Sequence, residues 1–374
     1  MKIGIDGRAA HWYRGTGIGT YTSQLINSLN SIDPINEYLI FEPENSKNSL
    51  NFKKNFSISY INSYTTDNFW DSIHIPGIIN STDMDIYHVP QNGVGLPKDL
   101  HCRKVITLHD IIPLKMPETV GERYLKIFNE EMEDIVKDCS GIITVSAFSQ
   151  RDISEEFNYP IDKIFVTPLA AEDIYKPMDK KYCRSIIEKQ YGIQDDFLLY
   201  VGGFSPRKNI LGLIEAFSLL LKNKTPDLKL VVTGRHGKSY EIYKNRTIEL
   251  GIESSIIFPG FIPLVDMPML YNAALFLAYP SFYEGFGLPP LECMACGTPV
   301  IASNVTSLPE VLGDSAILIN PHDVDELHAA CVSLLEDTQL QNTLIRKGLE
   351  RSFDFNWNKT ASATLSAYES ILNL

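Results

Sequence analysis

The sequence has little positive charge. Its 374 residues include 33 Lys and Arg but 46 Asp and Glu, which gives a formal net charge of −13. Proteins that bind nucleic acid usually present a concentrated positive field to the phosphates. The sequence therefore predicts no nucleic-acid partner.

Long hydrophobic runs are also missing. No stretch approaches the roughly 20 apolar residues that a membrane-spanning helix needs, and the amino terminus reaches the acidic Asp6 before any apolar segment of signal-peptide length. We therefore expect a cytoplasmic protein without a membrane span. Peripheral contact with the inner face of the cell membrane, through one face of a domain, remains open.

Cysteine is scarce and scattered. The six cysteines show no framework spacing, so reduced thiols are expected. Cys293 and Cys296 form a C-x-x-C pair, but neither a second pair nor histidines at ligand spacing accompany it. The sequence predicts two small residues that pack in a helix, and no metal site.

Apolar residues are present in ordinary proportion, and their pattern predicts an α/β protein. Hydrophobic residues make up 44% of the chain and charged residues 21%, as expected for a chain that buries a core. Short apolar runs that indicate buried strands alternate with segments of helical periodicity, which is typical of parallel sheets covered by helices. The predicted strands are 2–6, 84–89, 104–108 and 141–145, then 197–201, 228–232, 256–258, 274–278, 300–302 and 316–319.

The length suits two such domains, both Rossmann-like. Prolines at positions 168 and 177 flank a segment that fits neither the strand nor the helix pattern, so the boundary is expected there. The first domain is predicted over residues 1–170 and the second over residues 171–355. Residues 356–374 have helical spacing, and a return of this helix to the first domain is left open. The polar stretch 45–55 predicts a loop.

One glycine- and proline-rich stretch of the second domain predicts an anion site. Its glycines precede Pro289, a good first-turn residue, so a short helix is expected to begin near Leu288 and to end at Gly297. The start of such a helix favours phosphate. Glu284 precedes this helix and Glu292 lies inside it, where carboxylates can accept hydrogen bonds from sugar and ribose hydroxyls. A turn with two solvated acids is the alternative.

Two adjacent cations, Arg207 and Lys208, follow the predicted strand 197–201. They are therefore expected at the carboxyl end of a parallel strand, where open α/β sheets bind ligands. Arginine can fork across two phosphate oxygens, and lysine acts as a point charge. The pair predicts diphosphate binding, with a solvated surface turn as the alternative.

These two stretches resemble the signature of glycosyltransferase family 4, the retaining sugar-nucleotide transferases of GT-B fold. Glu284 and Glu292, with seven residues between them, are similar to the family's pair of acids, and Arg207 and Lys208 to its basic pair. The resemblance implies an α/β GT-B architecture, in which two Rossmann-like doubly wound domains face each other across a cleft. The segments that match the family, in order along the chain, are 4–8, 15–21, 107–110, 144–149, 205–209, 284–302 and 307–311.

The resemblance also implies a role for each matching residue. Arg207 and Lys208 would clamp the diphosphate, and Glu292 would contact the ribose. Glu284 would hold the donor sugar, which His109 would face from the first domain. The implied catalytic residues are thus His109, Arg207, Lys208 and Glu284. The other implied donor contacts are Gly15 and Gly17 near the phosphates, Gly260 and Phe261 near the nucleobase, and the backbone of Gly285, Phe286, Gly287 and Leu288, which with Glu284 would hold the donor sugar and the distal phosphate. Gly203 is a further implied donor contact, for which no position along the donor is implied.

The implied activity is retaining transfer of a hexose from a nucleotide diphosphate sugar. The pattern is most similar to bacterial mannosyltransferases that build surface polysaccharide, so GDP-mannose is the first choice of donor and a UDP-hexose the second. No metal or other cofactor is expected. The implied acceptor is a glycan or a lipid-linked glycan. Phe204 departs from the pattern, because some lipid-acceptor mannosyltransferases carry a second arginine in this region.

Other interpretations remain open. A sugar-nucleotide epimerase or hydrolase would use the same donor cleft, and a non-catalytic sugar-nucleotide-binding protein would retain it. Residues 15–19 are similar to a dinucleotide-binding loop, but Thr20 stands where that fingerprint requires glycine, which disfavours an NAD oxidoreductase. Asp83 and Asp85 form an Asp-x-Asp of the kind that can hold a divalent ion. Because it leads directly into a strand, a loop-to-strand junction is expected instead.

Overall fold

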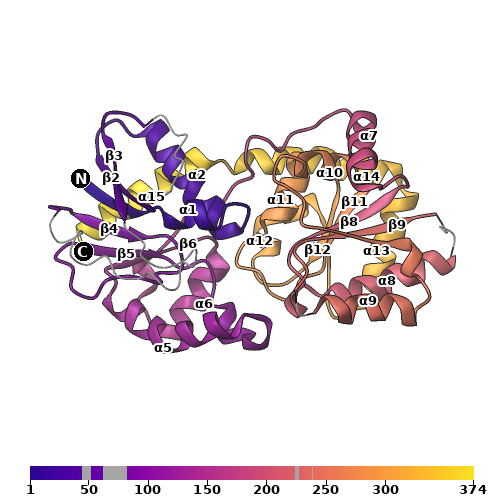
Figure 1. The fold of residues 1–374 in the computed structure, drawn as a ribbon, viewed down its shortest axis with the longest axis horizontal. Coiled ribbons are helices and arrows are strands. Elements are labelled where there is room, and N and C mark those ends of the chain that lie inside the picture. The colour runs from indigo at the N-terminus through magenta and orange to yellow at the C-terminus, as the bar shows by residue number, and fades with distance from the viewer. Residues whose placement is uncertain (44–51, 62–81, 224–226, 238) are drawn as a thin grey trace. The chain divides into compact units, whose positions relative to one another are not determined.

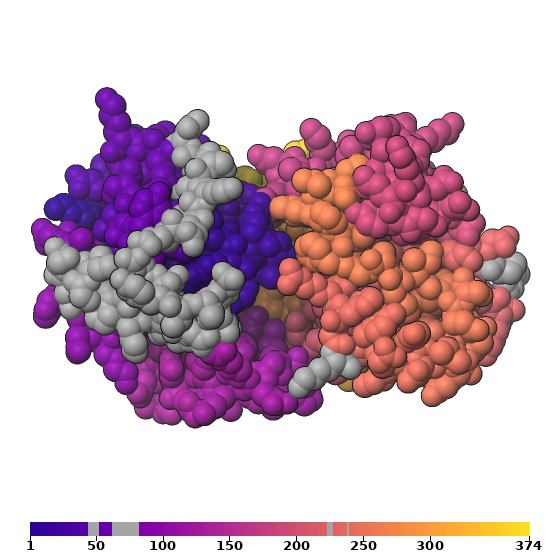
Figure 2. Space-filling model, viewed as in Figure 1, coloured from indigo at the N-terminus to yellow at the C-terminus, as the bar shows by residue number. Residues whose placement is uncertain are grey.

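The chain forms two compact units, seen in a computed structural model (Figure 1). Unit 1 comprises Met1–Leu169 together with Asn356–Leu374, and unit 2 comprises Ala170–Phe355. In the space-filling view, unit 2 carries the pink to orange part of the colour scale (Figure 2). The sequence prediction places the first boundary one residue later. The described residues are 1–43, 52–61, 82–223, 227–237 and 239–374, so most of the predicted loop 45–55 lies outside them.

Unit 1 is built on a seven-stranded parallel sheet in the order β3-β2-β1-β4-β5-β6-β7. The order reverses between β1 and β4, and open α/β sheets bind ligands at such a switch point. Figure 1 shows α2 and α15 on one side of the sheet and α5 and α6 on the other. The strands are β1 (Lys2–Asp6), β2 (Glu37–Pro43), β3 (Phe56–Ile61), β4 (Ile86–Val89), β5 (Arg103–Thr107), β6 (Gly141–Thr144) and β7 (Ile164–Val166), and the helices are α1 (Arg8–Trp12), α2 (Gly17–Ile32), α4 (Ile112–Lys115), α5 (Glu122–Asp138), α6 (Ala147–Phe157) and α15 (Trp357–Leu372).

The central strands of unit 1 are buried on both faces, as parallel strands covered by helices must be. Every residue of β4 and β6 is buried. Phe128 and Met132 of α5 pack with Tyr87 and Ile106 from the sheet in the core on that side. Continuous apolar runs, rather than alternation, therefore mark these strands in the sequence.

The last helix, α15, completes unit 1 and packs on α2 (Figure 1). Ile371 of this helix approaches β6 so closely that a Cβ atom at Gly141 would lie 2.5 Å from it. Glycine is therefore needed at that position. At the start of the helix, the hydroxyl of Thr360 donates to the carbonyl of Pro168 at 2.6 Å, which joins the helix to the end of the first segment of unit 1.

A buried series of hydrogen bonds anchors α15 to the sheet. The Tyr368 hydroxyl lies 2.7 Å from Nδ1 of His88, and Nε2 of His88 lies 2.7 Å from the Thr107 hydroxyl. That hydroxyl lies 2.9 Å from the hydroxyl of Tyr21. Burial lowers the pKa of His88 to about 3, so its imidazole is neutral at physiological pH.

Acid is expected to destabilise unit 1 through its buried histidines. Burial lowers the pKa of His88 to about 3 and that of His109 to about 4, against about 6.5 in the unfolded chain. The unfolded chain therefore binds more protons below pH 6.5, and stability falls as the pH drops from there. Linkage predicts a loss of about 2 kcal/mol per histidine at pH 5. Denaturant titrations at pH 7.5 and pH 5 would measure it.

Tryptophan fluorescence reports on this unit, because Trp12, Trp70 and Trp357 all fall in its part of the sequence. His88→Gln should lower stability at pH 7.5 but flatten its dependence on pH. The exposed His101→Gln is the matched control and should keep the wild-type dependence. Equal slopes in wild type and His88→Gln would contradict the assignment.

Unit 2 repeats the same architecture with six parallel strands in the order β10-β9-β8-β11-β12-β13. Its order reverses between β8 and β11, which makes this pair the switch point of the second sheet. The strands are β8 (Phe197–Val201), β9 (Lys229–Thr233), β10 (Ile256–Gly260), β11 (Phe276–Tyr279), β12 (Val300–Ser303) and β13 (Ile317–Ile319), and the helices are α7 (Lys180–Tyr191), α8 (Ile210–Asn223), α9 (Tyr240–Glu249), α10 (Met267–Ala273), α11 (Leu288–Ala295), α12 (Leu308–Leu312), α13 (Val324–Glu336) and α14 (Thr338–Asp354).

The predicted α/β class with two Rossmann-like sheets is confirmed. The predicted strands all occur, and their ends differ from the prediction by at most two residues. The sequence patterns missed β2, β3 and β7. β7 has only three residues, and β3 is buried at its two ends but not between them, so neither gives a clear apolar run. β2 was missed although it has seven residues and is mostly buried. The patterns also missed α1, a five-residue helix between β1 and the glycine-containing segment 15–19.

Candidate active site

Arg207 and Lys208 lie at the carboxyl edge of the sheet of unit 2. They belong to a single 3-10 turn, Pro206–Lys208, that follows β8. The turn ends at Asn209 in the left-handed region, at φ 54°. The Asn209 side chain fixes this end, since its Oδ1 accepts the N–H of Gly212 at 3.2 Å and its amide donates to the carbonyl of Pro321 at 2.7 Å.

A second loop, residues 280–287 after β11, closes over this turn. The N–H of Phe282 donates to the carbonyl of Arg207 at 2.8 Å. Arg207 in turn donates from its guanidinium to the carbonyl of Tyr283. Because β8 and β11 are neighbours at the switch point, the two loops meet where ligands of open α/β sheets bind.

Glu284 joins the two cations directly. Its Oε2 lies 2.9 Å from Nη1 of Arg207, and its Oε1 lies 2.6 Å from Nζ of Lys208. Nζ of Lys208 also donates to the hydroxyl of Tyr279 at 2.5 Å and lies 4.7 Å from the centre of that ring. Glu284 and Lys208 are buried, with 7% and 8% of their surfaces exposed.

The electrostatics of this cluster favour the ionised carboxylate. Burial alone would raise the pKa of Glu284, but attraction to Arg207 and Lys208 outweighs burial and lowers the pKa to about 2. The cluster therefore carries two cations and one anion near neutral pH. The net positive charge suits an anionic ligand group, and the carboxylate can accept a hydrogen bond from a ligand hydroxyl.

Helix α11 begins directly after this loop, at the predicted residue Leu288. Gly287 precedes it with φ 109°, a conformation that other residues rarely adopt. Pro289 and Pro290 follow in the first turn and carry no N–H. The helix start thus offers fewer N–H donors than the sequence prediction supposed, and Gly285, Phe286 and Gly287 supply the other backbone amides of this region.

Glu292 lies in α11, half-buried, and is oriented by a tyrosine. The hydroxyl of Tyr271 donates to its Oε2 at 2.8 Å. Tyr271 is fully buried, and its ring lies 5.7 Å from that of Tyr175. Burial and the charge of Glu292 raise the pKa of both tyrosine hydroxyls, so both remain protonated.

The remaining predicted residues of unit 2 lie at the carboxyl ends of β8 and β10, along the same edge of the sheet. The exposed Gly203 accepts a hydrogen bond from the Tyr200 hydroxyl at 3.0 Å. Gly260 has φ 80°, and its carbonyl accepts the N–H of Gly234 at 3.0 Å. The ring of Phe261 is 49% exposed, and the guanidinium carbon of Arg235 lies 5.1 Å from its centre.

Phe204, the departure from the family pattern, belongs to the core. Only 4% of its surface is exposed, and its ring contacts those of Tyr240, Tyr243 and Phe258. An arginine at position 204 with the same side-chain orientation would bury its charge among aromatic rings. With phenylalanine there, this region has one cation fewer than the family pattern and more apolar packing.

His109 lies at the carboxyl end of β5 in unit 1. Its backbone N–H donates to Oδ1 of Asn92 at 2.9 Å, and its Nε2 lies 3.0 Å from the carbonyl of Pro90. A carbonyl can only accept, so Nε2 carries the proton and Nδ1 is left as an acceptor. Burial lowers the pKa of His109 to about 4, while the bond to Pro90 opposes that shift.

Gly15 and Gly17 also lie in unit 1, before and at the start of α2. Gly15 has φ 89°. Gly17 is the first residue of the helix, which Thr16 caps by accepting the N–H of Gly19 at 3.3 Å. The structure thus brings Arg207, Lys208 and Glu284 into contact, whereas His109, Gly15 and Gly17 belong to the other unit.

Tyr279 and Asn92 support these residues but were not singled out by the sequence patterns. Tyr279 is the last residue of β11, one position beyond the predicted strand. Asn92 has φ 53° and precedes Gly93, and an Asn-Gly pair after a strand is a recognisable turn signal. A buried ion pair between Asp6 and Arg8, 2.6 Å apart at the end of β1, was also missed as a feature of unit 1.

The other predicted features have structural explanations. Asp85 Oδ2 accepts the N–H of Lys2 at 2.7 Å just before β4, so the Asp-x-Asp lies at the amino edge of the sheet as a loop-to-strand junction. Cys293 and Cys296 are buried in and after α11, and burial raises the pKa of both thiols. In the described part of the chain, His, Cys, Asp and Glu do not gather in groups of three or more suited to a metal ion.

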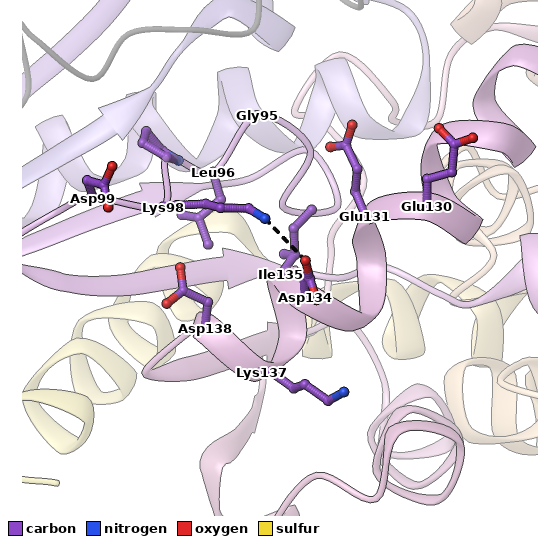
Figure 3. Close-up of a pocket in the computed structure, with 11 residues that line it drawn as sticks. Gly95, Leu96, Lys98, Asp99, Glu130, Glu131, Asp134, Ile135, Lys137 and Asp138 are labelled. Carbon is purple, nitrogen blue, oxygen red and sulfur yellow. Dashed lines mark hydrogen bonds and ion pairs between the residues drawn. The ribbon is translucent and has the colours of Figure 1, made fainter.

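A cavity of about 690 Å³ in unit 1 is a separate feature (Figure 3). It lies between the loop after β4 and the second half of α5, and Figure 3 shows Lys98 reaching towards Asp134, 3.2 Å away. Asp138, at one end, pairs with Lys104 at the start of β5, so this end lies at the amino edge of the sheet. The predicted site residues are not among those that line the cavity.

Two comparisons of the sequence identify relatives. The family model described as glycosyl transferases group 1 matches residues 184–351. O-antigen chain mannosyltransferase B of Escherichia coli is 37% identical over 285 residues, covering 76% of this chain and 74% of that protein. Serotype-specific mannosyltransferase WbdA of Escherichia coli is 30% identical over 291 residues; the match covers 76% of this chain but 36% of that protein, so the chain spans about a third of this longer relative.

Solved structures share the fold. Sucrose-phosphate synthase of Thermosynechococcus elongatus superposes with a TM-score of 0.77 at 20% identity, covering 100% of this chain and 99% of the other. Anabaena HepE in complex with UDP and glucose gives a TM-score of 0.75 at 18% identity, covering 99% of each chain. The described helices include none long and apolar enough to cross a membrane.

The likeness to these solved structures confirms the predicted GT-B architecture, and the similarity to the mannosyltransferase of Escherichia coli shows that the chain belongs to the group 1 glycosyl transferases.

Proposed function

We propose that this glycosyltransferase is a retaining mannosyltransferase that uses GDP-mannose to extend a glycan, free or lipid-linked, in the synthesis of a bacterial surface polysaccharide. The observation that carries the proposal is the contact of Arg207, Lys208 and Glu284 at the switch point of unit 2. The relatives named as O-antigen chain and serotype-specific mannosyltransferases support the choice of sugar. A lipid-linked acceptor would place the enzyme in the cytoplasm, at the inner face of the membrane.

Stabilisation of the leaving group is the main task of this cluster. Cleavage of the donor leaves negative charge on the departing diphosphate and positive charge on the sugar. Two cations held in place before the reaction stabilise the diphosphate without reorganisation, and burial strengthens their field. Glu284 holds both cations in position, and its carboxylate can accept a hydrogen bond from a sugar hydroxyl. We propose that these groups act without a metal ion.

The proposed chemistry needs no protein base. The bond between the anomeric carbon and the phosphate oxygen breaks, the acceptor oxygen bonds to that carbon from the same face, and the acceptor's proton passes to the departing phosphate. His109 fits this scheme because it is neutral and, with a pKa near 4, a weak base. Its Nδ1, the acceptor nitrogen of this tautomer, can accept a hydrogen bond from the transferred sugar.

A UDP-hexose is the second candidate donor, because the neighbouring HepE structure holds UDP and glucose. Purified protein incubated with a panel of nucleotide sugars, with and without a glycan acceptor, tests both candidates. We expect release of GDP only when GDP-mannose and acceptor are both present, undiminished by excess chelator, and an α-linked product by NMR. Release without acceptor would indicate an epimerase or hydrolase, and binding without release a non-catalytic protein.

Removal of the ribose contact should weaken nucleotide binding. Glu292→Ala deletes the carboxylate that Tyr271 orients, and a hydrogen bond to a charged group is typically worth about 1.5–3 kcal/mol. We expect affinity for GDP to fall at least tenfold, measured by calorimetry, with a smaller change in kcat at saturating donor. Glu350→Ala, on the exposed face of α14, is the matched control. Unchanged affinity with lost turnover would exchange the roles of Glu292 and Glu284.

A further inference from the structure

The loop that carries Glu284 is held by a neighbouring segment, residues 304–308, which runs from the end of β12 to the first residue of α12. The hydroxyl of Thr306 accepts the N–H of Glu284 at 3.2 Å. The hydroxyl of Ser307 is shared between the carbonyls of Glu284, at 2.8 Å, and Phe286, at 3.0 Å. The backbone on both sides of the Glu284 side chain is therefore bonded to two adjacent hydroxyls.

Thr306 makes its contact from an unfavourable backbone conformation. Its φ is 57°, in the left-handed region, which is a genuine outlier for a β-branched residue. Such conformations cost free energy and persist only when surrounding contacts impose them. Here the imposing contacts are the bond to Glu284 and a second bond that the same hydroxyl donates to the carbonyl of Val305 at 2.8 Å.

Packing fixes the far end of the loop. A Cβ atom at Gly287 would lie 2.6 Å from Cδ2 of Leu308, so the first residue of α12 fills the space beside the start of α11. Ser307 and Leu308 are both fully buried. The segment thus contacts the loop at Glu284, at Phe286 and at Gly287, and water does not compete for the two Ser307 bonds.

We propose that Thr306 and Ser307 are positioning residues of the active site, which hold the carboxylate of Glu284 against Arg207 and Lys208 and set the start of α11. The inference rests on the proposed function for its effect on turnover. The physical reason is that preorganised charges stabilise a transition state only while their positions are fixed. A loss of about 1 Å in precision at such a site can cost on the order of a hundredfold in rate.

Thr306→Val and Ser307→Ala remove each hydroxyl while keeping the shape of the side chain or most of it. Thr306→Ser restores the hydroxyl and is the rescue variant. Ser303→Ala is the matched control, because Ser303, the last residue of β12, directly precedes this segment, is also fully buried, and has a hydroxyl without a hydrogen-bond partner. The measurements are kcat and KM for GDP-mannose well below the melting temperature, and hydrogen exchange of peptides covering residues 283–288.

In Thr306→Val and Ser307→Ala, kcat should fall at least tenfold with a smaller change in KM, and amide exchange of the loop should rise at least tenfold. Thr306→Ser and Ser303→Ala should match wild type. A purely structural role would lower the melting temperature of these variants without changing kcat. Unchanged exchange in both hydroxyl deletions would overturn the inference. If the wild-type protein transferred no sugar at all, the proposed function would fail, while the exchange measurement would still decide whether these hydroxyls hold the loop.

Discussion

Lys208→Ala is expected to lower kcat about a hundredfold. Removal of one preorganised group that stabilises charge in the transition state typically costs about 3 kcal/mol. Lys208 is such a group, because Glu284 and Tyr279 hold its ammonium from two sides within a buried site. Arg207 would remain paired with Glu284, and the cluster would lose its net positive charge. Steady-state kinetics with GDP-mannose and acceptor would measure the loss.

Two further variants separate loss of charge from loss of packing. Lys208→Met keeps most of the side-chain volume and should be as impaired as Lys208→Ala. Lys347→Ala removes a lysine that pairs with the exposed Asp314 elsewhere in unit 2, and it should turn over as wild type. Wild-type turnover in Lys208→Ala would defeat the assignment of the diphosphate clamp.

Glu284→Gln is expected to reduce transfer at least a hundredfold while nucleotide binding is retained. Glutamine keeps the shape of the side chain but leaves Arg207 and Lys208 without their counter-charge. Breaking a buried ion pair by removal of one partner costs about 3–5 kcal/mol, so the free variant should be less stable. An anionic ligand can supply the missing charge, so GDP should bind at least as tightly as to wild type.

Thermal unfolding with and without GDP tests this expectation directly. The melting temperature of Glu284→Gln should rise more on addition of GDP than that of wild type, because the diphosphate restores a counter-charge for Arg207 and Lys208 only in the variant. Glu350→Gln, on the solvent face of α14, should show the wild-type shift. A smaller shift in Glu284→Gln than in wild type would mean that Glu284 contributes mainly to nucleotide binding.

The predictable part of the structure follows from local patterns. Continuous apolar runs located the buried strands such as β8, whose bounds match the prediction, and the glycines with Pro289 located the start of α11. Arg207 and Lys208 were placed at a strand end by the same patterns. Each of these inferences needs only residues that are close together in the chain.

The contacts that complete the site depend on which strands are neighbours, and local patterns do not encode this. Lys208 meets Tyr279 and Glu284 because β8 lies beside β11 in the sheet, although two strands, β9 and β10, separate them in the sequence. Thr306 reaches Glu284 because β12 lies on the other side of β11. The positive φ of Thr306 is also unpredictable from its residue type, since threonine normally avoids that region.

The return of α15 to unit 1 has a consequence for biosynthesis. Residues 1–169 are translated first, but the helix that completes their unit, α15, is translated only after all of Ala170–Phe355. At about 5–20 residues per second, the gap lasts roughly 10–40 s. Unit 2 is continuous in the chain and can fold in that interval. During the same interval the surface of the amino-terminal sheet that binds α15 stays uncovered. We therefore expect chaperones to bind the nascent chain mainly in this period.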